Sequence, residues 1–224
     1  MKNSALIAIS FFLAGCTSWK YNVSEDGVIF RITSWNHDPI EVKVEGADPE
    51  TFRVKKRGYA IDENSVFYKG VRIDDAEPRS FRMLSDGYAA DDVSVYLYRC
   101  RLDSADPERF EVLEERWGRD SYRVYHGYRL VAEADASTFQ LVGRNWAIDH
   151  QRAFHALPWA TIECSDNDIL EVKVFEGIDP STFSVLSGFT ARDKNRTYDA
   201  LTNPDKVEDT NPDSGSAPSG RISY

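Results

Sequence analysis

A motif of 29 residues recurs along this chain and constrains its fold more than any other feature. Phe52, Phe81, Phe110 and Phe139 mark four copies at that spacing, and Phe183 marks a fifth after 44 residues. Ten residues after each phenylalanine stands an aspartate: Asp62, Asp91, Asp120, Asp149 and Asp193. Fifteen residues after it stands an aromatic residue: Phe67, Tyr96, Tyr125, Phe154 and Tyr198. Because several columns keep one spacing, the sequence predicts tandem structural repeats.

Each copy has the pattern of a β-meander. Phe52 and Val54 alternate with Arg53 and Lys55, which is the period of two expected for a half-buried strand. We expect further strands from residue 60, over 65–68 and over 71–73, with a turn at Lys69-Gly70. The acidic residue four positions before each phenylalanine, usually followed by proline, predicts a capped turn; this column is Asp48, Glu77, Asp106, Asp135 and Asp179.

These patterns predict an all-β fold built from about five stacked repeats. A unit of 29 residues buries too little surface to fold alone, so neighbouring units must lean on one another. We expect an open superhelical stack or a curved sheet rather than a closed propeller, since the units are short for four-stranded blades. The expected units lie near 46–74, 75–103, 104–132, 133–176 and 177–202.

Two irregular segments flank or interrupt the array. The fourth unit carries an insertion of 15 residues around Pro158 to Glu176. Within it, the stretch Glu171–Val174 repeats the stretch Glu41–Val44, so residues 27–45 are predicted to be a partial, capping copy. The repeat domain is therefore expected to span 27–202. Residues 203–224 are rich in Pro, Asp, Ser and Gly, which predicts a disordered acidic tail.

The repeat motif resembles the DKNYY family of bacterial envelope proteins. The matching stretches are Gly58–Asp62, Gly87–Asp91 and Asp193–Tyr198, within a resemblance that covers roughly residues 46 to 200. The third and fourth units depart from the pattern, with tryptophan in place of the tyrosine. The resemblance implies an architecture and no particular activity.

The amino-terminal segment is typical of a lipoprotein precursor. A short positive start precedes the apolar run 5–14, which is too short to span a bilayer as a helix. The run ends in Leu13-Ala14-Gly15-Cys16, which resembles the lipobox of bacterial lipoproteins. That resemblance implies a signal peptide over 1–15, cleavage before Cys16 and a lipid on the Cys16 thiol. Residues 16–26 are then expected to be the lipidated cysteine and its tether to the fold.

Localisation and charge narrow the class of partner. An aspartate directly after the lipidated cysteine would favour retention at the inner membrane. Thr17 occupies that position here, so we expect the protein at the outer membrane, facing the periplasm. The formal charge is −10, and loss of Lys2 with the signal peptide makes it −10 − 1 = −11. A chain this acidic is repelled by nucleic acid, so nucleic-acid binding is not expected. The oligomeric state is left open.

Few residues suggest chemistry. Cys100 and Cys164 could form one disulfide in an oxidising compartment, or remain two separate buried thiols. His155 and Cys164 could form a nucleophilic pair, although nothing else in the sequence supports one. The aspartate column is better explained by hairpin turns than by calcium ligation, because no second acidic position accompanies it. We therefore expect no catalytic residue, cofactor or metal.

Two aromatic columns could form either the core or a ligand groove. The core is favoured, because each unit needs one large residue where it meets its neighbour. Tyr98, Tyr122 and Tyr128 keep the groove as an alternative. The first column is Tyr59, Tyr88, Trp117 and Trp146, and the second is Phe67, Tyr96, Tyr125 and Phe154.

The leading functional hypothesis is a non-enzymatic, lipid-anchored envelope protein whose repeats bind a protein or a glycan. The first alternative is a membrane-anchored immunity or inhibitor protein that neutralises a toxin, for which an acidic surface would suit a basic partner. The second alternative is an envelope hydrolase, which no recognisable site supports.

Overall fold

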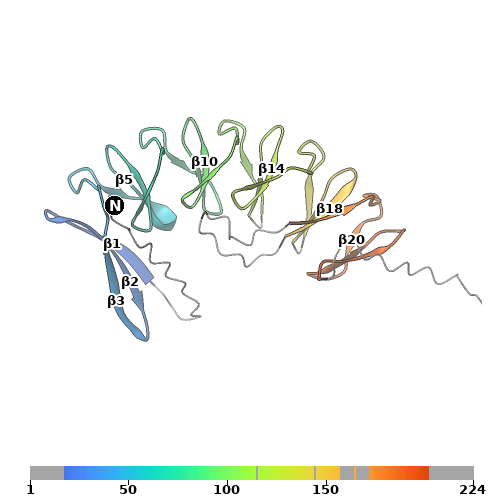
Figure 1. Cartoon of the computed structure of the whole chain (residues 1–224), viewed down its shortest axis with the longest axis horizontal. Helices are drawn as coiled ribbons and strands as arrows, with labels where there is room; N and C mark the ends of the chain where they lie inside the picture. Colours follow the sequence, from blue (N-terminus) through green and yellow to red (C-terminus); the bar gives the residue numbers. More distant parts are fainter. Residues whose placement is uncertain (1–17, 115, 144, 157–163, 165–171, 202–224) are drawn as a thin grey trace, which may run out of the picture. The chain divides into compact units, whose positions relative to one another are not determined.

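The strands of the computed structural model form small antiparallel sheets, each of which is a meander in chain order (Figure 1). The structure describes residues 18–114, 116–143, 145–156, 164 and 172–201. Within these residues there are six sheets, and no α-helix occurs. The all-β repeat array predicted from the sequence is therefore confirmed. The predicted signal peptide and tail lie outside the described residues. The chain divides into two compact units, one ending at Phe81 and one beginning at Arg82.

The first unit contains two sheets. The first sheet comprises β1 (Ser18–Ser24), β2 (Gly27–Ser34) and β3 (His37–Lys43). The second comprises β4 (Arg53–Val54), β5 (Tyr59–Ile61), β6 (Val66–Tyr68) and β7 (Val71–Ile73), with a single 3₁₀ turn η1 (Lys56–Gly58) before β5.

The prediction that residues 16–26 form a tether is wrong from residue 18 onward. Ser18–Ser24 pairs with β2 along its whole length. The reason is visible in its alternation, since Tyr21 turns inward beside Phe30, with ring centroids 5.0 Å apart. The capping sheet therefore begins at 18 and not at 27.

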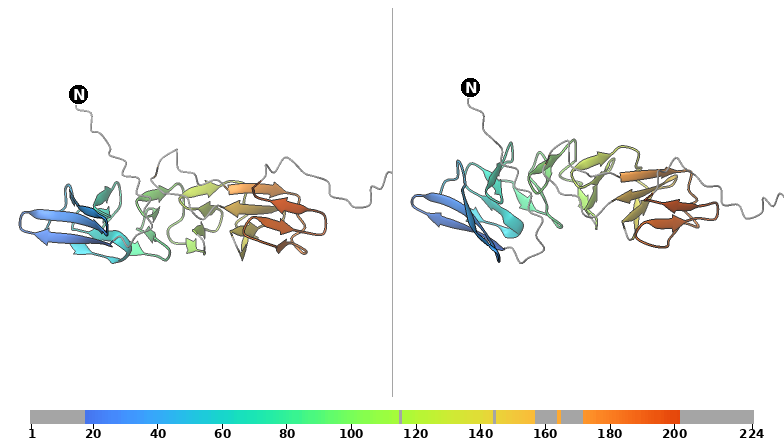
Figure 2. Two further views of the ribbon diagram at one scale, coloured as in Figure 1. Left: turned by 90° about the horizontal axis from the view of Figure 1, so that it is seen from below. Right: turned by 60° about the horizontal axis from the view of Figure 1, so that its bottom comes forward.

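The second unit contains four sheets that follow one another in a row in chain order, as Figures 1 and 2 both show. Three have four strands and the last has three. The first of these sheets comprises β8 (Arg82–Met83), β9 (Tyr88–Ala90), β10 (Val95–Leu97) and β11 (Cys100–Leu102), and the second comprises β12 (Glu111–Val112), β13 (Trp117–Arg119), β14 (Val124–His126) and β15 (Arg129–Val131). The third comprises β16 (Gln140–Gly143), β17 (Trp146–Ile148), β18 (Arg152–Ala156) and β19 (Val172–Glu176). The fourth comprises β20 (Ser184–Val185), β21 (Thr190–Arg192) and β22 (Thr197–Asp199).

The insertion in the fourth repeat falls at one hairpin. Strands β18 and β19 pair from Arg152↔Glu176 to Ala156↔Val172, so residues 157–171 connect them. In the first repeat the same position is the short turn Lys69-Gly70 between β6 and β7. A connection can lengthen at a hairpin without disturbing the paired strands, which explains why the repeat tolerates 15 extra residues.

The marker phenylalanines occupy equivalent positions. Each ring lies against an aromatic ring of the preceding sheet, and the rings of Phe52, Phe110, Phe139 and Phe183 also lie against the aromatic residue fifteen positions later in their own repeats. Phe139, for example, lies 5.0 Å from Trp117 and 5.7 Å from Phe154, measured between ring centroids. The other pairs with the preceding sheet are Phe52–Tyr21 at 5.3 Å, Phe81–Tyr59 at 5.4 Å, Phe110–Tyr88 at 5.4 Å and Phe183–Trp146 at 5.9 Å. The predicted stacking of neighbours through this column is confirmed.

A column of small residues makes room for these rings. The residue eight positions after each phenylalanine pairs with the buried aromatic across the hairpin, as Ala147 does with Phe154. In the third repeat the small residue is Gly118, where a Cβ would lie 2.3 Å from Cζ of Phe110. The alanines of this column are fully buried: Ala60, Ala89, Ala147 and Ala191.

The aliphatic residue two positions after each phenylalanine is not a core residue. Val54 is 50% exposed, although the alternation predicts that it turns inward with Phe52. The first strand of each repeat is only two to four residues long and lies at the edge of its sheet, so its end is not covered. The edge strand of each sheet is thereby apolar but short, which limits unwanted pairing with other strands.

Candidate binding groove

The aspartate column closes hairpin turns. Oδ1 of Asp149 accepts hydrogen bonds from the backbone N–H groups of Gln151 at 2.8 Å and Arg152 at 2.6 Å. The same arrangement recurs at Asp62, Asp91, Asp120 and Asp193. All five side chains are buried. These contacts support the turn interpretation of the column over calcium ligation.

The second carboxylate oxygen of this column reaches back to the preceding connection. Oδ2 of Asp193 accepts the backbone N–H of Asp179 at 2.7 Å and the hydroxyl of Tyr198 at 2.6 Å. Burial by itself would raise the pKa of Asp193, but the hydrogen bonds from Tyr198 and from backbone N–H groups outweigh it and hold that pKa below its usual value. The stretch Asp193–Tyr198 is thus one hydrogen-bonded turn.

The aromatic columns form the core and not a groove. All eight side chains are fully buried, with 0% exposure: Tyr59, Tyr88, Trp117, Trp146, Phe67, Tyr96, Tyr125 and Phe154. Of the three extra tyrosines, Tyr98 and Tyr128 are half-buried and only Tyr122 is well exposed, at 77%. The alternative of an aromatic groove built on these columns is therefore wrong, because the repeats use them to cover one another.

In the second repeat the polar end of this column binds the backbone of the next repeat. The hydroxyl of Tyr88 lies 2.7 Å from the carbonyl oxygens of both Arg116 and Gly127. In the fourth repeat tryptophan replaces the tyrosine, and His155, which pairs with Trp146 across the strands, makes the link instead. Its Nε2 lies 2.8 Å from the carbonyl oxygen of Gly188, which requires that Nε2 carry the proton. Burial lowers the pKa of His155.

Cys100 and Cys164 form a disulfide, with their Cα atoms 5.1 Å apart. Of the two arrangements that the sequence leaves open, the structure has the bonded one. The bond joins β11 of the second repeat to the connection inserted in the fourth. It also removes the thiol that a Cys164–His155 nucleophilic pair would need. Cys16, the predicted lipid-attachment residue, lies outside the described residues.

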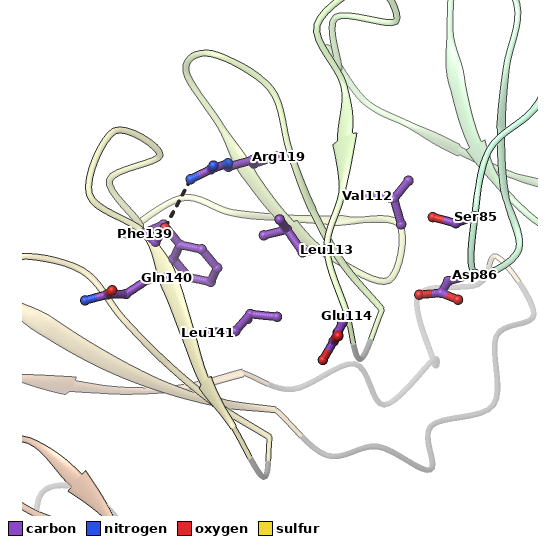
Figure 3. A pocket seen from close by; sticks show the side chains of 9 residues that line it. All are labelled: Ser85, Asp86, Val112, Leu113, Glu114, Arg119, Phe139, Gln140 and Leu141. Carbon is purple, nitrogen blue, oxygen red and sulfur yellow. Dashed lines mark hydrogen bonds between the residues drawn. The ribbon is translucent and has the colours of Figure 1, made fainter.

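A groove runs across the second, third and fourth repeats. Its volume is about 510 Å³, and it is lined by Ser85, Asp86, Val112, Leu113, Glu114, Arg119, Phe139, Gln140 and Leu141. Figure 3 shows the side chains of Leu113, Leu141 and Glu114 facing one shared space, with Asp86 and Ser85 beyond Val112. The edge strands β12 and β16 supply much of this lining, so the half-exposed aliphatic positions of successive repeats meet here.

The charges in the groove are unequal. Arg119 is held by Glu111, with Nε 2.9 Å from its carboxylate, and donates from a terminal nitrogen to the carbonyl oxygen of Phe139 at 3.1 Å (Figure 3). Asp86 and Glu114 are exposed. The groove therefore offers an apolar floor with exposed carboxylates, a lining suited to a segment that carries apolar and basic side chains.

Within the residues that are described, no helix is long and apolar enough to cross a membrane.

Stacked meanders with a shallow inter-repeat groove define a β-repeat protein. The model of the DKNYY family matches residues 33–156, which is more than half of the chain, and the chain belongs to this family. The comparisons with curated proteins and with solved structures found no match.

The groove was not foreseen from the sequence. Its residues come from three repeats and occupy different repeat positions, so no local motif marks them. The available signal was the aliphatic column after each phenylalanine, with Val112 and Leu141 as its members here. Their half-exposure becomes evident only once the first strand of each repeat is found at a sheet edge.

Proposed function

We propose that this chain is a non-enzymatic, lipid-anchored protein of the cell envelope whose repeat array binds a protein partner in the groove between its second and fourth repeats. The anchor in this proposal is a lipid on Cys16, after removal of residues 1–15, and the membrane is the outer membrane, facing the periplasm. The sequence Leu13-Ala14-Gly15-Cys16 supports the anchor. The groove supports the binding role.

The observation that carries the binding role is the pairing of apolar and acidic side chains along one groove. Leu113 and Leu141 are half-buried and face the same space, so an apolar side chain placed between them would be removed from water on both sides. Asp86 and Glu114 would attract a basic segment, in keeping with a formal charge of −10.

A peptide fits this groove better than a glycan. Sugar sites commonly use exposed aromatic faces as stacking platforms, but the one aromatic residue of the lining, Phe139, is 3% exposed and packs within the repeats. A partner with a basic surface would also suit the alternative function as an immunity or inhibitor protein. The immunity role differs from the leading proposal only in the identity of the bound protein.

Site-specific crosslinking in intact envelopes tests the binding role. A photoreactive amino acid at Leu141, in the groove, is compared with one at Leu130, which is exposed on β15 of the third repeat. We expect a discrete crosslinked protein from Leu141 that is absent from Leu130 and is lost when Leu113→Asp is added. Equal crosslinking from both positions, or none from Leu141, contradicts the groove. A captured toxin would favour the immunity role.

The anchor has a separate test. Labelled palmitate should be incorporated into the wild-type chain and not into Cys16→Ser, and the variant should leave the membrane fraction. Label that persists in Cys16→Ser contradicts the proposed attachment site.

A further inference from the structure

The described tryptophans fall into two groups. Trp117 and Trp146 are fully buried between repeats, at 0% exposure. Trp35 is 87% exposed and Trp19 is 38% exposed, and both belong to the first sheet. Exposure of a large apolar side chain at a hairpin tip, as for Trp35, or on an edge strand, as for Trp19, gains nothing for the fold, so these two positions call for a different explanation.

Strand register places both tryptophans at one end of the first sheet. Ser18 pairs with Thr33, and Trp19 pairs with Ile32. On the other side of β2, the pair Ser34↔His37 closes the β2–β3 hairpin, whose two turn residues are Trp35 and Asn36. The chain thus enters the sheet at the end where the Trp35 tip projects. Cys16 precedes Ser18 by two residues, a span of at most about 7 Å of extended chain.

The apolar face of this sheet also continues to that end. Phe30 is buried in the core of the first unit, and the ring of Trp19 stacks beside it at 6.0 Å between centroids. Beyond Phe30 the facing pair Ile32↔Ile40 is only half-buried. The first repeat therefore covers one part of the face fully, and a partly covered apolar strip leads from Phe30 to the tip.

The geometry points to the end of the first sheet, with Trp35 and Trp19, as a membrane-contact surface that enters the headgroup layer of the bilayer carrying the Cys16 lipid. This inference rests on the proposed anchor. Indole rings favour the boundary between headgroups and acyl chains, because the ring is apolar and its N–H can still bind water or a lipid oxygen. Lipid chains alone hold the protein without setting its orientation, and a second contact beside the anchor would restrict it.

Quenching by lipids with brominated acyl chains tests the contact. The mature chain beginning at Cys16 is coupled through that thiol to a maleimide phospholipid, which supplies an anchor whether or not the cell adds one; the other two cysteines are joined in the disulfide. The coupled protein is bound to vesicles of phosphatidylethanolamine and phosphatidylglycerol. The emission of Trp35 is the difference between wild type and Trp35→Phe.

We expect the Trp35 emission to shift to shorter wavelength and to lose most of its intensity on brominated vesicles. The matched control is Val23→Trp in the Trp35→Phe background, which places an indole at an exposed position at the opposite end of the same sheet. Its emission should not change. If Trp35 emission is unquenched while the protein is vesicle-bound, the contact is refuted, and a dimer that Trp35→Ser dissolves would make a second copy the occupant. Failure of palmitate labelling in cells would reject the natural anchor alone.

Discussion

Oδ2 of Asp149 accepts a hydrogen bond from the backbone N–H of Asp135, 14 residues earlier, at 3.1 Å. The same separation links Asp62 to Asp48, Asp120 to Asp106 and Asp193 to Asp179. In these four repeats one aspartate therefore ties the turn that closes a hairpin to the connection that enters the repeat. In these repeats the later acidic column supplies the carboxylate and the earlier column supplies the backbone N–H of one hydrogen bond.

Substitution of Asp149 should destabilise its repeat in proportion to the acceptors lost. Asp149→Ala leaves three backbone N–H groups without their acceptor in a buried site and should cost about 2–4 kcal/mol. Asp149→Asn keeps an oxygen for Gln151 and Arg152 but loses the bond to Asp135, so its cost should be smaller. Denaturant unfolding measures both. Equal stability of the two variants would contradict the separate role of Oδ2.

The stability of the array should fall as the pH drops from 7 to 5. Burial holds the folded pKa of His155 below the value of the unfolded chain, about 6.5, and Lys173, its partner across the strands, acts in the same direction. The unfolded chain therefore binds more protons below that pH, and unfolding is favoured as the pH falls. His155→Gln keeps a donor for Gly188 and does not titrate. Its stability should change less across this window, and an identical slope in both proteins would exclude His155 as the cause.

Reduction of the Cys100–Cys164 disulfide should weaken the second unit and leave the first unchanged. The two cysteines are 64 residues apart, and the loop-entropy model gives at most about 4 kcal/mol for a loop of this size. Hydrogen exchange with and without reductant resolves the two units, and Cys100→Ala with Cys164→Ala serves as the permanently reduced form. If residues 18–81 lose as much protection as the second unit, this assignment is contradicted.

The sequence predicted the repeats and the strands within them because each repeat carries its own turn residues and its own buried aromatic side chains. The segment Ser18–Ser24 alternates apolar and polar residues, but its position beside the proposed anchor suits a tether equally well, and only its pairing with β2 distinguishes the two. The sequence also left the groove undetected. Side chains such as Leu113 and Leu141 belong to different repeats, so their meeting depends on how sheets stack, which no local pattern encodes.

The central claim is that each repeat is stabilised by its neighbour through the marker phenylalanine. Phe139→Ala tests it most directly, because that ring belongs to the fourth repeat and lies against Trp117 of the third. Amide hydrogen exchange should show loss of protection in both repeats, in β13 and β14 as well as in β17 and β18, with a cost of about 3–5 kcal/mol. Loss of protection confined to the fourth repeat, with the third unchanged, would contradict the account.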